Sequence, residues 1–272
     1  MNLMDTSCYE RLCQIVYDQS GIRIRDGKST MVASRIANRL RVLGLGSELE
    51  YVQYLERSMT EEIVHLLDAI STNVTSFYRE SKHFEMVRDA MRGWLDTGQR
   101  RFRFWSAACS TGEEPYTLAM TARDVAGEIR QPTNIKILAT DISTRVLAEA
   151  QAGVYGIKRV ESIPAEQRRK HMQKVAGEGD DAYRVSPQLR EMIVFRRMNL
   201  SLPPFPMKGP MDIIFCRNVM IYFDDQVRDA LLAEFHRLLR PDGYLMVGHS
   251  EGLTRSAHLF SRDGASTYRP IK

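Results

Sequence analysis

Several features that would narrow the function of this chain are missing from its 272 residues. No apolar run approaches the roughly 20 residues that a membrane-spanning helix needs. The N-terminus, MNLMDTSCYERLCQ, has no basic segment followed by an apolar core, so we expect no signal peptide. The four cysteines match neither a zinc-binding spacing nor a disulfide framework: Cys8, Cys13, Cys109 and Cys216. These absences predict a cytoplasmic protein with reduced thiols and no metal site.

Two common phosphate-binding motifs are missing from the turn at residues 106–116, SAACSTGEEPY. This turn joins an expected strand, RFRFWSA, to an expected helix, which is where nucleotide-binding loops occur. It contains only Gly112, without G-x-G-x-x-G or GK[ST], and it carries Glu113 and Glu114, which would repel a phosphate. A ligand with a ribose and a cationic end suits these carboxylates, and S-adenosylmethionine has both. Alternatively, the glutamates only stabilise the positive N-terminus of the helix.

The position of Pro115 bears on the choice between the two glutamates. Proline favours the first position of a helix, because it has no N–H to offer there. Pro115 as the first helical residue would place Glu114 at the N-cap, with its side chain near the mouth of the loop. The sequence therefore favours Glu114 over Glu113 for ligand contact.

Charge is modest overall, with a net +4, but it is concentrated near the N-terminus. Residues 21–42 contain six basic side chains and one acid, Asp26. The basic ones are Arg23, Arg25, Lys28, Arg35, Arg39 and Arg41. Such a cluster predicts an anionic partner, although a merely solvated helix face explains it equally well.

The first 70 residues have the apolar spacing of amphipathic helices. In one of them the apolar residues follow steps of four, four and three: Val32, Ile36, Leu40 and Leu43. Gly44 is placed to end this helix and Ser47 to cap the next one. Residues 1–70 are therefore predicted to form a small helical domain.

From residue 82 onward, expected helices and strands alternate, which predicts an α/β domain with a largely parallel sheet over 82–272. The apolar runs IKILA and DIIFC are typical of strands covered on both faces. Residues 153–190 interrupt the alternation, are polar and contain a GEGDD turn, so we expect a small inserted subdomain with a β-hairpin. A polar linker, residues 71–81, separates the two domains.

Polar residues follow the expected strands, where ligands bind in open α/β sheets. Asp141 ends the second strand, where an acid can accept hydrogen bonds from the hydroxyls of a ribose. The alternative is that Asp141 or Ser143 caps the next helix. Later strands are followed by Asn199, by Arg217 and Asn218, and by GHSE at 248–251.

Six segments together resemble one family. They are NVTSFYRES, FWSAACSTGEEPYTLAM, ILATDIS, MNL, FCRNVMIYF and GYLMVGHSE. In this order and spacing they closely resemble the CheR family of chemotaxis-receptor methyltransferases, over nearly the whole chain. The resemblance implies a Rossmann-like class I S-adenosylmethionine-dependent methyltransferase domain with an N-terminal all-helical domain and a small β-subdomain. It also implies a protein-glutamate O-methyltransferase that uses S-adenosylmethionine and releases S-adenosylhomocysteine.

The resemblance assigns roles to residues that match the motifs. It implies that the linker lines the cofactor pocket, that Glu114 meets the methionyl end, that Asp141 holds the ribose and that Asn199 and Leu200 flank the adenine. Arg79 and Tyr222 would orient the substrate glutamate, and no metal ligands are implied. The expected cofactor-binding residues are Asn73, Thr75, Arg79, Glu114, Asp141, Asn199, Leu200, Arg217 and Asn218.

The implied partners are the cytoplasmic methylation helices of chemotaxis receptors. Their acidic surface would dock on the basic helix through Lys28, Arg35 and Arg39. We expect a monomer that binds no nucleic acid and reaches the membrane only through the receptor. The loop KVAGEGDDAYRV of the insertion is longer than in members that grip a receptor C-terminal peptide, so we expect no such requirement.

Two other functions remain open on the sequence. One is an S-adenosylmethionine-dependent methyltransferase acting on another class of substrate, such as nucleic acid or a small molecule. The other is a receptor-binding homologue that has kept the fold and lost turnover.

Overall fold

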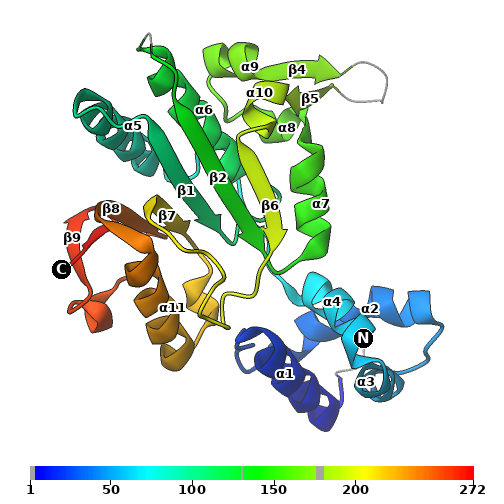
Figure 1. The fold of residues 1–272 in the computed structure, drawn as a ribbon. Coiled ribbons are helices and arrows are strands. Elements are labelled where there is room, and N and C mark those ends of the chain that lie inside the picture. The colour runs from blue at the N-terminus through cyan, green and yellow to red at the C-terminus, as the bar shows by residue number, and fades with distance from the viewer. Residues whose placement is uncertain (1–3, 130, 176–180) are drawn as a thin grey trace.

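The computed structural model describes residues 4–129, 131–175 and 181–272. Its first part is a bundle of four helices, which lies at the lower right of Figure 1. The helices are α1 (Thr6–Ser20), α2 (Ser29–Leu43), α3 (Glu48–Arg57) and α4 (Met59–Ile70). They share one hydrophobic core, in which Leu12, Val32, Tyr51 and Leu66 have no exposed surface. The helical prediction for this part of the chain is confirmed.

The ends of these helices are set by local chemistry. Gly44 adopts a left-handed φ of 69° at the end of α2, a conformation in which glycine avoids the Cβ clash. The hydroxyl of Ser47 accepts a hydrogen bond from the N–H of Glu50 and so caps α3. Both predicted helix ends are therefore confirmed.

A seven-stranded sheet forms the centre of the molecule, in the order β6-β2-β1-β7-β8-β10-β9. The first five strands in this order are parallel, and β10 pairs antiparallel with both β8 and β9. The strands are β1 (Arg101–Ala107), β2 (Asn134–Asp141), β6 (Ile193–Arg197), β7 (Met211–Cys216), β8 (Leu239–Val247), β9 (Phe260–Gly264) and β10 (Thr267–Pro270). The predicted alternation of helices and strands is confirmed, but the hairpin partner β9 was not predicted.

Helices cover both faces of the sheet. Phe102 and Phe104 of β1 pack into a core with α5 (Lys82–Asp96), α6 (Glu113–Gly127) and α7 (Thr144–Ala152). Trp105 of the same strand packs into a second core with α11 (Asp225–Leu238). The central strand is thus apolar on both sides, as its sequence indicates.

The insertion forms a small subdomain, drawn at the upper right of Figure 1. Its sheet has the antiparallel order β3-β5-β4, so the predicted hairpin is confirmed as β4–β5 and gains a third strand. The elements are β3 (Val154–Gly156), α8 (Ile157–Val160), α9 (Ala165–His171), β4 (Met172–Val175), β5 (Ala182–Val185) and α10 (Pro187–Arg190). The loop glycines at 177 and 179, on which the peptide expectation depended, lie outside the described residues.

The helical bundle lies against the carboxyl ends of the parallel strands. In Figure 1 the arrowheads of β1, β2 and β6 point towards α1 and α4. Tyr17 of α1 donates a hydrogen bond to Asp224 (2.5 Å), and the amide of Asn199 donates to the carbonyl of Gln19 (2.9 Å). This is the edge of an α/β sheet at which ligands bind. Among the helices of the described residues, none combines the length and the hydrophobicity of a membrane-spanning segment.

Candidate functional site

A cavity of about 990 Å³, open solvent at its mouth included, lies between the helical bundle and the carboxyl ends of the strands. Its lining combines apolar side chains with a small number of polar and charged ones, as in small-molecule pockets. The chain order of the sheet reverses between β1 and β7, so the loops after these strands diverge and leave a crevice. All ten residues expected at the site line this one cavity: Asn73, Thr75, Arg79, Glu114, Asp141, Asn199, Leu200, Arg217, Asn218 and Tyr222.

Strained backbone surrounds the cavity. Ala108, Ser110 and Asn218 all line it with a positive φ, of 63°, 50° and 59°. Tyr78 and Glu80, on either side of Arg79, share this conformation. For residues other than glycine it costs on the order of 1–3 kcal/mol each and occurs mainly at functional sites. The strain is consistent with a ligand site at this position.

The two glutamates of the first loop have separate roles. Helix α6 begins at Glu113 with Gly112 as its N-cap, so the prediction of Pro115 as the first helical residue is wrong. Gly112 takes the cap at a φ of 96°, and a Cβ there would lie 2.8 Å from the hydroxyl of Tyr155. The early start places both glutamates in the first turn.

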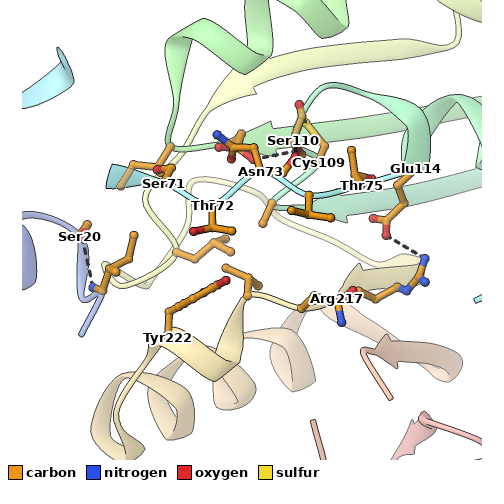
Figure 2. A pocket seen from close by; sticks show the side chains of 18 of the residues that line it. Ser20, Ser71, Thr72, Asn73, Thr75, Cys109, Ser110, Glu114, Arg217 and Tyr222 are labelled. Carbon is orange, nitrogen blue, oxygen red and sulfur yellow. Dashed lines mark hydrogen bonds and ion pairs between the residues drawn. The ribbon is translucent and has the colours of Figure 1, made fainter. Parts of the chain in front are cut away.

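Glu113 is buried and faces the insertion rather than the cavity. Its carboxylate accepts hydrogen bonds from Arg159 of α8 and from the hydroxyl of Thr111 (2.7 Å). Glu114 lines the cavity, as Figure 2 shows, with one oxygen 2.7 Å from Ser106 Oγ and the other 3.1 Å from Arg217 Nη1. Of the two glutamates, Glu114 is the one that lines the cavity.

Arg217 links three segments at the floor of the cavity. Besides Glu114, it contacts Glu80 (Nη2–Oε2, 3.1 Å) and donates to the carbonyl of Arg79 (2.6 Å). Burial raises the pKa of Glu114, and Arg217 and Ser106 oppose this rise. Burial also tends to raise the pKa of Glu80, but the positive charge of Arg217 outweighs this effect and the pKa of Glu80 is lowered. The pair between Glu80 and Arg217 was not predicted, because no spacing in the sequence connects position 80 with position 217.

A histidine pair extends this cluster away from the cavity. The ring of His83 is fully buried and lies 3.6 Å from Glu80 Oε2, and His249 Nε2 lies 3.7 Å from the same oxygen. Burial lowers the pKa of His83 to about 4, so the ring is neutral at neutral pH. The sequence places His249 after the last expected strand, but its proximity to Glu80 and His83 was not predicted.

Asp141 is held by backbone N–H groups at the end of β2. One oxygen accepts from Ser110 (2.8 Å) and the other from Ser143 (3.0 Å), with 6% of the residue exposed. Burial raises its pKa, and these backbone hydrogen bonds oppose the rise. The cap of α7 is Ser143, whose hydroxyl accepts from Val146, so capping does not account for Asp141.

The linker passes over the top of the cavity in Figure 2, where Thr72, Asn73 and Thr75 are labelled. Asn73 Nδ2 is buried without a hydrogen-bond partner among the described residues. A buried donor of this kind is costly unless a ligand or water accepts its hydrogen bond. Arg79 donates a hydrogen bond to the carbonyl of Val74 (2.6 Å), so the side chain of one linker residue binds the backbone of another.

Tyr222 rises from the opposite wall, with its hydroxyl directed into the cavity (Figure 2). It lies in a short 3-10 helix, η1 (Met220–Tyr222), whose last carbonyl accepts from the N–H of Arg23 (2.8 Å). Ser20 and Ile22 at the end of α1 complete this wall. No sequence motif pointed to these two residues, because they come from the other part of the chain.

The basic side chains of α2 are not all exposed as a docking surface, in contrast to the prediction. Arg39 forms a two-pronged pair with the buried Glu62 (2.9 and 2.7 Å), so the expectation that its charge faces a partner is wrong. Arg35 donates to the carbonyl of Ile70 and to the hydroxyl of Thr72 (3.1 Å). Both side chains hold α2 against α4 and the linker. Lys28 is exposed.

The polar groups of the cavity fit S-adenosylmethionine. Glu114 offers a carboxylate for an ammonium group, Asp141 offers acceptors for a ribose, and Asn73 offers an unpaired donor. The cavity wall also has an apolar part for a purine, which includes Ile142, Met198 and Leu200. Both lining carboxylates disfavour a phosphate.

Comparison with known proteins agrees with this chemistry. The family model "CheR methyltransferase, SAM binding domain" matches residues 73–269, and "CheR methyltransferase, all-alpha domain" matches residues 8–71. The chemotaxis protein methyltransferase of Borreliella burgdorferi is 39% identical over 92% of this chain and 89% of its own. Chemotaxis protein methyltransferase 2 of Pseudomonas aeruginosa is 39% identical (96% and 92%), and the Escherichia coli protein is 37% identical (96% and 89%).

Solved structures match more distantly. An S-adenosylmethionine-dependent methyltransferase from Geobacter sulfurreducens in complex with S-adenosylhomocysteine has a TM-score of 0.36 and 14% identity. The match covers 68% of this chain and 53% of that one. Both family models and the relatives cover the chain almost end to end. The chain belongs to the CheR family of chemotaxis protein methyltransferases, which use S-adenosylmethionine.

Proposed function

We propose that this protein transfers the methyl group of S-adenosylmethionine to glutamate side chains on the cytoplasmic methylation helices of chemotaxis receptors, forming methyl esters. The observation that carries the proposal is the convergence of all ten motif residues on one cavity. The relatives named above are chemotaxis protein methyltransferases over nearly the same length.

The reaction needs no general base. A glutamate has a pKa of about 4.3 and is already a carboxylate nucleophile at neutral pH. Bound S-adenosylmethionine supplies an activated methyl group on its sulfonium. The protein then has to align the two reactants and exclude water, and alignment alone supplies roughly 7–11 kcal/mol of a barrier. The absence of histidine from the lining of the cavity, among the described residues, accords with this chemistry.

We assign the cofactor contacts by chemical type. Glu114 binds the ammonium group at the methionyl end of the cofactor. Arg217 and Asn218 form the floor of the cavity and bind the carboxylate group at the same end. Asp141 binds the ribose hydroxyls. Asn199 and Leu200 flank the adenine, and Asn73 and Thr75 close the site from the linker.

Arg79 and Tyr222 are assigned to orienting the substrate glutamate. Both line the cavity, from the linker and from η1. A rigid salt bridge to the substrate would stabilise the ground state and oppose the reaction. Arg79 Nη1 donates to the carbonyl of Val74, which anchors one nitrogen of the guanidinium at the cavity wall while the group keeps its positive charge.

Receptor docking is assigned to the exposed basic residues at the start and end of α2. Lys28 and Arg41 are both exposed, and Arg25 precedes them in the chain with an exposed side chain. An acidic helical surface is complementary to these charges. Arg39 contributes indirectly, since its pairing with Glu62 holds α2 in place.

The deciding experiment uses S-adenosylmethionine labelled with tritium in the methyl group. The protein is incubated with receptor-containing membranes, and the radioactivity released from protein by mild base is measured. Base-labile label that maps to receptor glutamates is expected. Base-stable label, or label in nucleic acid, would indicate another substrate class. Normal cofactor binding without any label in receptor would indicate a non-catalytic homologue.

A further inference from the structure

The Glu80, His83 and His249 cluster lies behind Arg217 and is not explained by methyl transfer. One ligand atom from each of the three residues can be chosen so that all three lie within 4.8 Å of one another. Glu80 Oε2 is 3.6 Å from His83 Nδ1 and 3.7 Å from His249 Nε2. A tetrahedral zinc ion with bonds of about 2.0–2.2 Å places its ligand atoms about 3.4 Å apart. The two distances are close to that spacing.

His83 is the residue that points to a ligand. Its ring is fully buried, and its Nε2 lies 3.2 Å from the carbonyl oxygen of Ala265. Because a carbonyl only accepts, Nε2 carries the hydrogen and the lone pair is on Nδ1. Nδ1 has no hydrogen-bond partner among the described residues. Metal-binding histidines are commonly held in this way, with the second ring N–H donated to a carbonyl.

The surrounding charge can accommodate a divalent cation. Glu80 and Glu114 both pair with Arg217, and Glu251 accepts hydrogen bonds from the backbone N–H groups of Asn218 and Gly248 (2.7 Å each). Three carboxylates against one guanidinium leave two negative charges. His249 has 56% of its side chain exposed, so the cluster opens to solvent on that side.

We propose that Glu80, His83 and His249 form a binding site for a zinc-like divalent cation. Two imidazole nitrogens and one carboxylate suit zinc, and solvent would fill the fourth position. The site lies outside the cofactor cavity and is linked to it by Arg217, which lines the cavity and pairs with Glu80. The cation and Arg217 would share the Glu80 carboxylate. A bound cation should weaken the ion pair between Glu80 and Arg217. Because Arg217 lines the cavity, cofactor binding should weaken as well.

The test uses metal-free full-length protein and zinc chloride in calorimetry, with cobalt(II) absorption as a second readout. One zinc per chain is expected, with a visible cobalt spectrum typical of tetrahedral nitrogen and oxygen ligands. H249Q and, separately, H83Q should each weaken zinc binding at least tenfold. The matched control H258Q removes an exposed histidine outside the cluster and should leave the affinity unchanged.

Three results would overturn the site. They are the absence of saturable binding, binding that H249Q and H83Q leave intact, or binding that H258Q removes equally. A circular dichroism spectrum of each variant shows whether it is folded. H249Q should be the better tolerated substitution, because the side chain of His249 is largely exposed. Coupling is tested by titrating S-adenosylhomocysteine with and without zinc. A several-fold loss of affinity is expected, with a reciprocal loss for zinc. Equal affinities would overturn the coupling.

Discussion

Glu113 and Glu114 are neighbours in the chain, yet their partners lie in different parts of the structure. Glu113 pairs with Arg159 of the insertion, and Glu114 pairs with Arg217 at the cavity floor. Successive residues of a helix are about 100° apart, so two adjacent carboxylates cannot share a ligand easily. At the scale of single residues, the fold assigns one glutamate to structure and the other to the site.

Replacement of the two glutamates should separate these roles. In Glu114→Gln, loss of a charged hydrogen bond to the cofactor ammonium costs about 1.5–3 kcal/mol, which is roughly a 10- to 150-fold loss of affinity. Isothermal titration with S-adenosylhomocysteine measures this. Glu113→Gln should leave the affinity nearly unchanged and lower the unfolding midpoint instead. A larger affinity loss in Glu113→Gln than in Glu114→Gln would refute the assignment.

Tyr222 and Arg79 should affect turnover more than binding. Tyr222→Phe removes only the hydroxyl that points into the cavity, and Arg79→Ala removes the guanidinium. Each should lower kcat at least tenfold, about 1.4 kcal/mol of barrier, while the affinity for S-adenosylhomocysteine changes little. Receptor methylation rates and calorimetry on the same preparations test this. Unchanged turnover in either variant would remove that residue from the mechanism.

At the scale of elements, polar clusters join segments that are far apart in sequence. Asp124 of α6 contacts Lys170 and His171 (2.9 Å) at the end of α9, which fastens the insertion to the main domain. Burial alone would raise the pKa of Asp124, but hydrogen bonds from His171, Lys170 and Gln167 lower it to about 2. Its ionised form therefore stabilises the fold.

The sign of the pH dependence follows from that lowered pKa. Ionised Asp124 contributes its full stabilisation of the fold at pH values above 3.8, its pKa in the unfolded chain. This contribution is lost as the pH falls through about 2, its pKa in the folded protein. Asp124 is only partly buried, so its ion pairs are partly screened by solvent. We expect the unfolding free energy of Asp124→Asn, measured in urea at pH 7, to be about 1–2 kcal/mol lower than that of the wild type. The difference should shrink to about half at pH 3. A difference that is constant between pH 7 and pH 3 would contradict the expectation.

The pair between Arg39 and Glu62 holds α2 against α4 in the same way. Glu62 is 2% exposed and also accepts from the hydroxyl of Tyr51 (2.9 Å). Arg39→Ala would leave this carboxylate without its cation, at a cost of about 3–5 kcal/mol in the unfolding free energy. The exposed Arg41 on the same helix provides the control, since Arg41→Ala should change stability by less than about 0.5 kcal/mol. Equal effects of the two changes in denaturant titrations would argue against a structural role for Arg39.

At the scale of the whole molecule, the cavity is closed by both parts of the chain. Ser20 ends α1 and Ile22 lies just after it, whereas Asp141 ends β2 and Asn218 lies just after β7. A ligand in this cavity contacts the helical bundle and the sheet together, so binding should couple their stabilities.

This coupling is measurable by calorimetric unfolding. S-adenosylhomocysteine at 100 times its Kd should add about 2.7 kcal/mol to the unfolding free energy. The helical bundle and the sheet domain should both shift to higher temperature. A shift confined to the sheet domain would show that the bundle does not contribute to ligand binding. Glu114→Gln at the same ligand concentration is the matched control, and it should show a smaller shift.

The elements and the cofactor class followed from local patterns in the sequence. Apolar spacing predicted α1 to α4 and the parallel strands, because burial of one helix stripe or of both strand faces depends on neighbouring residues. Strand-end positions brought Asp141, Asn199 and Asn218 to one edge, because parallel strands end together. The missing phosphate motifs and the family resemblance then indicated S-adenosylmethionine.

Only the tertiary structure decided which charged groups face each other. Arg39 pairs with Glu62 and Arg217 with Glu80, across 23 and 137 residues of chain. No local periodicity encodes such pairs, because they depend on how whole elements pack. For the same reason the histidine cluster behind Arg217 and the wall formed by Ser20 and Ile22 could not be foreseen. The sequence by itself determined the elements and the chemistry of the ligand, and packing determined which side chains remain available to bind it.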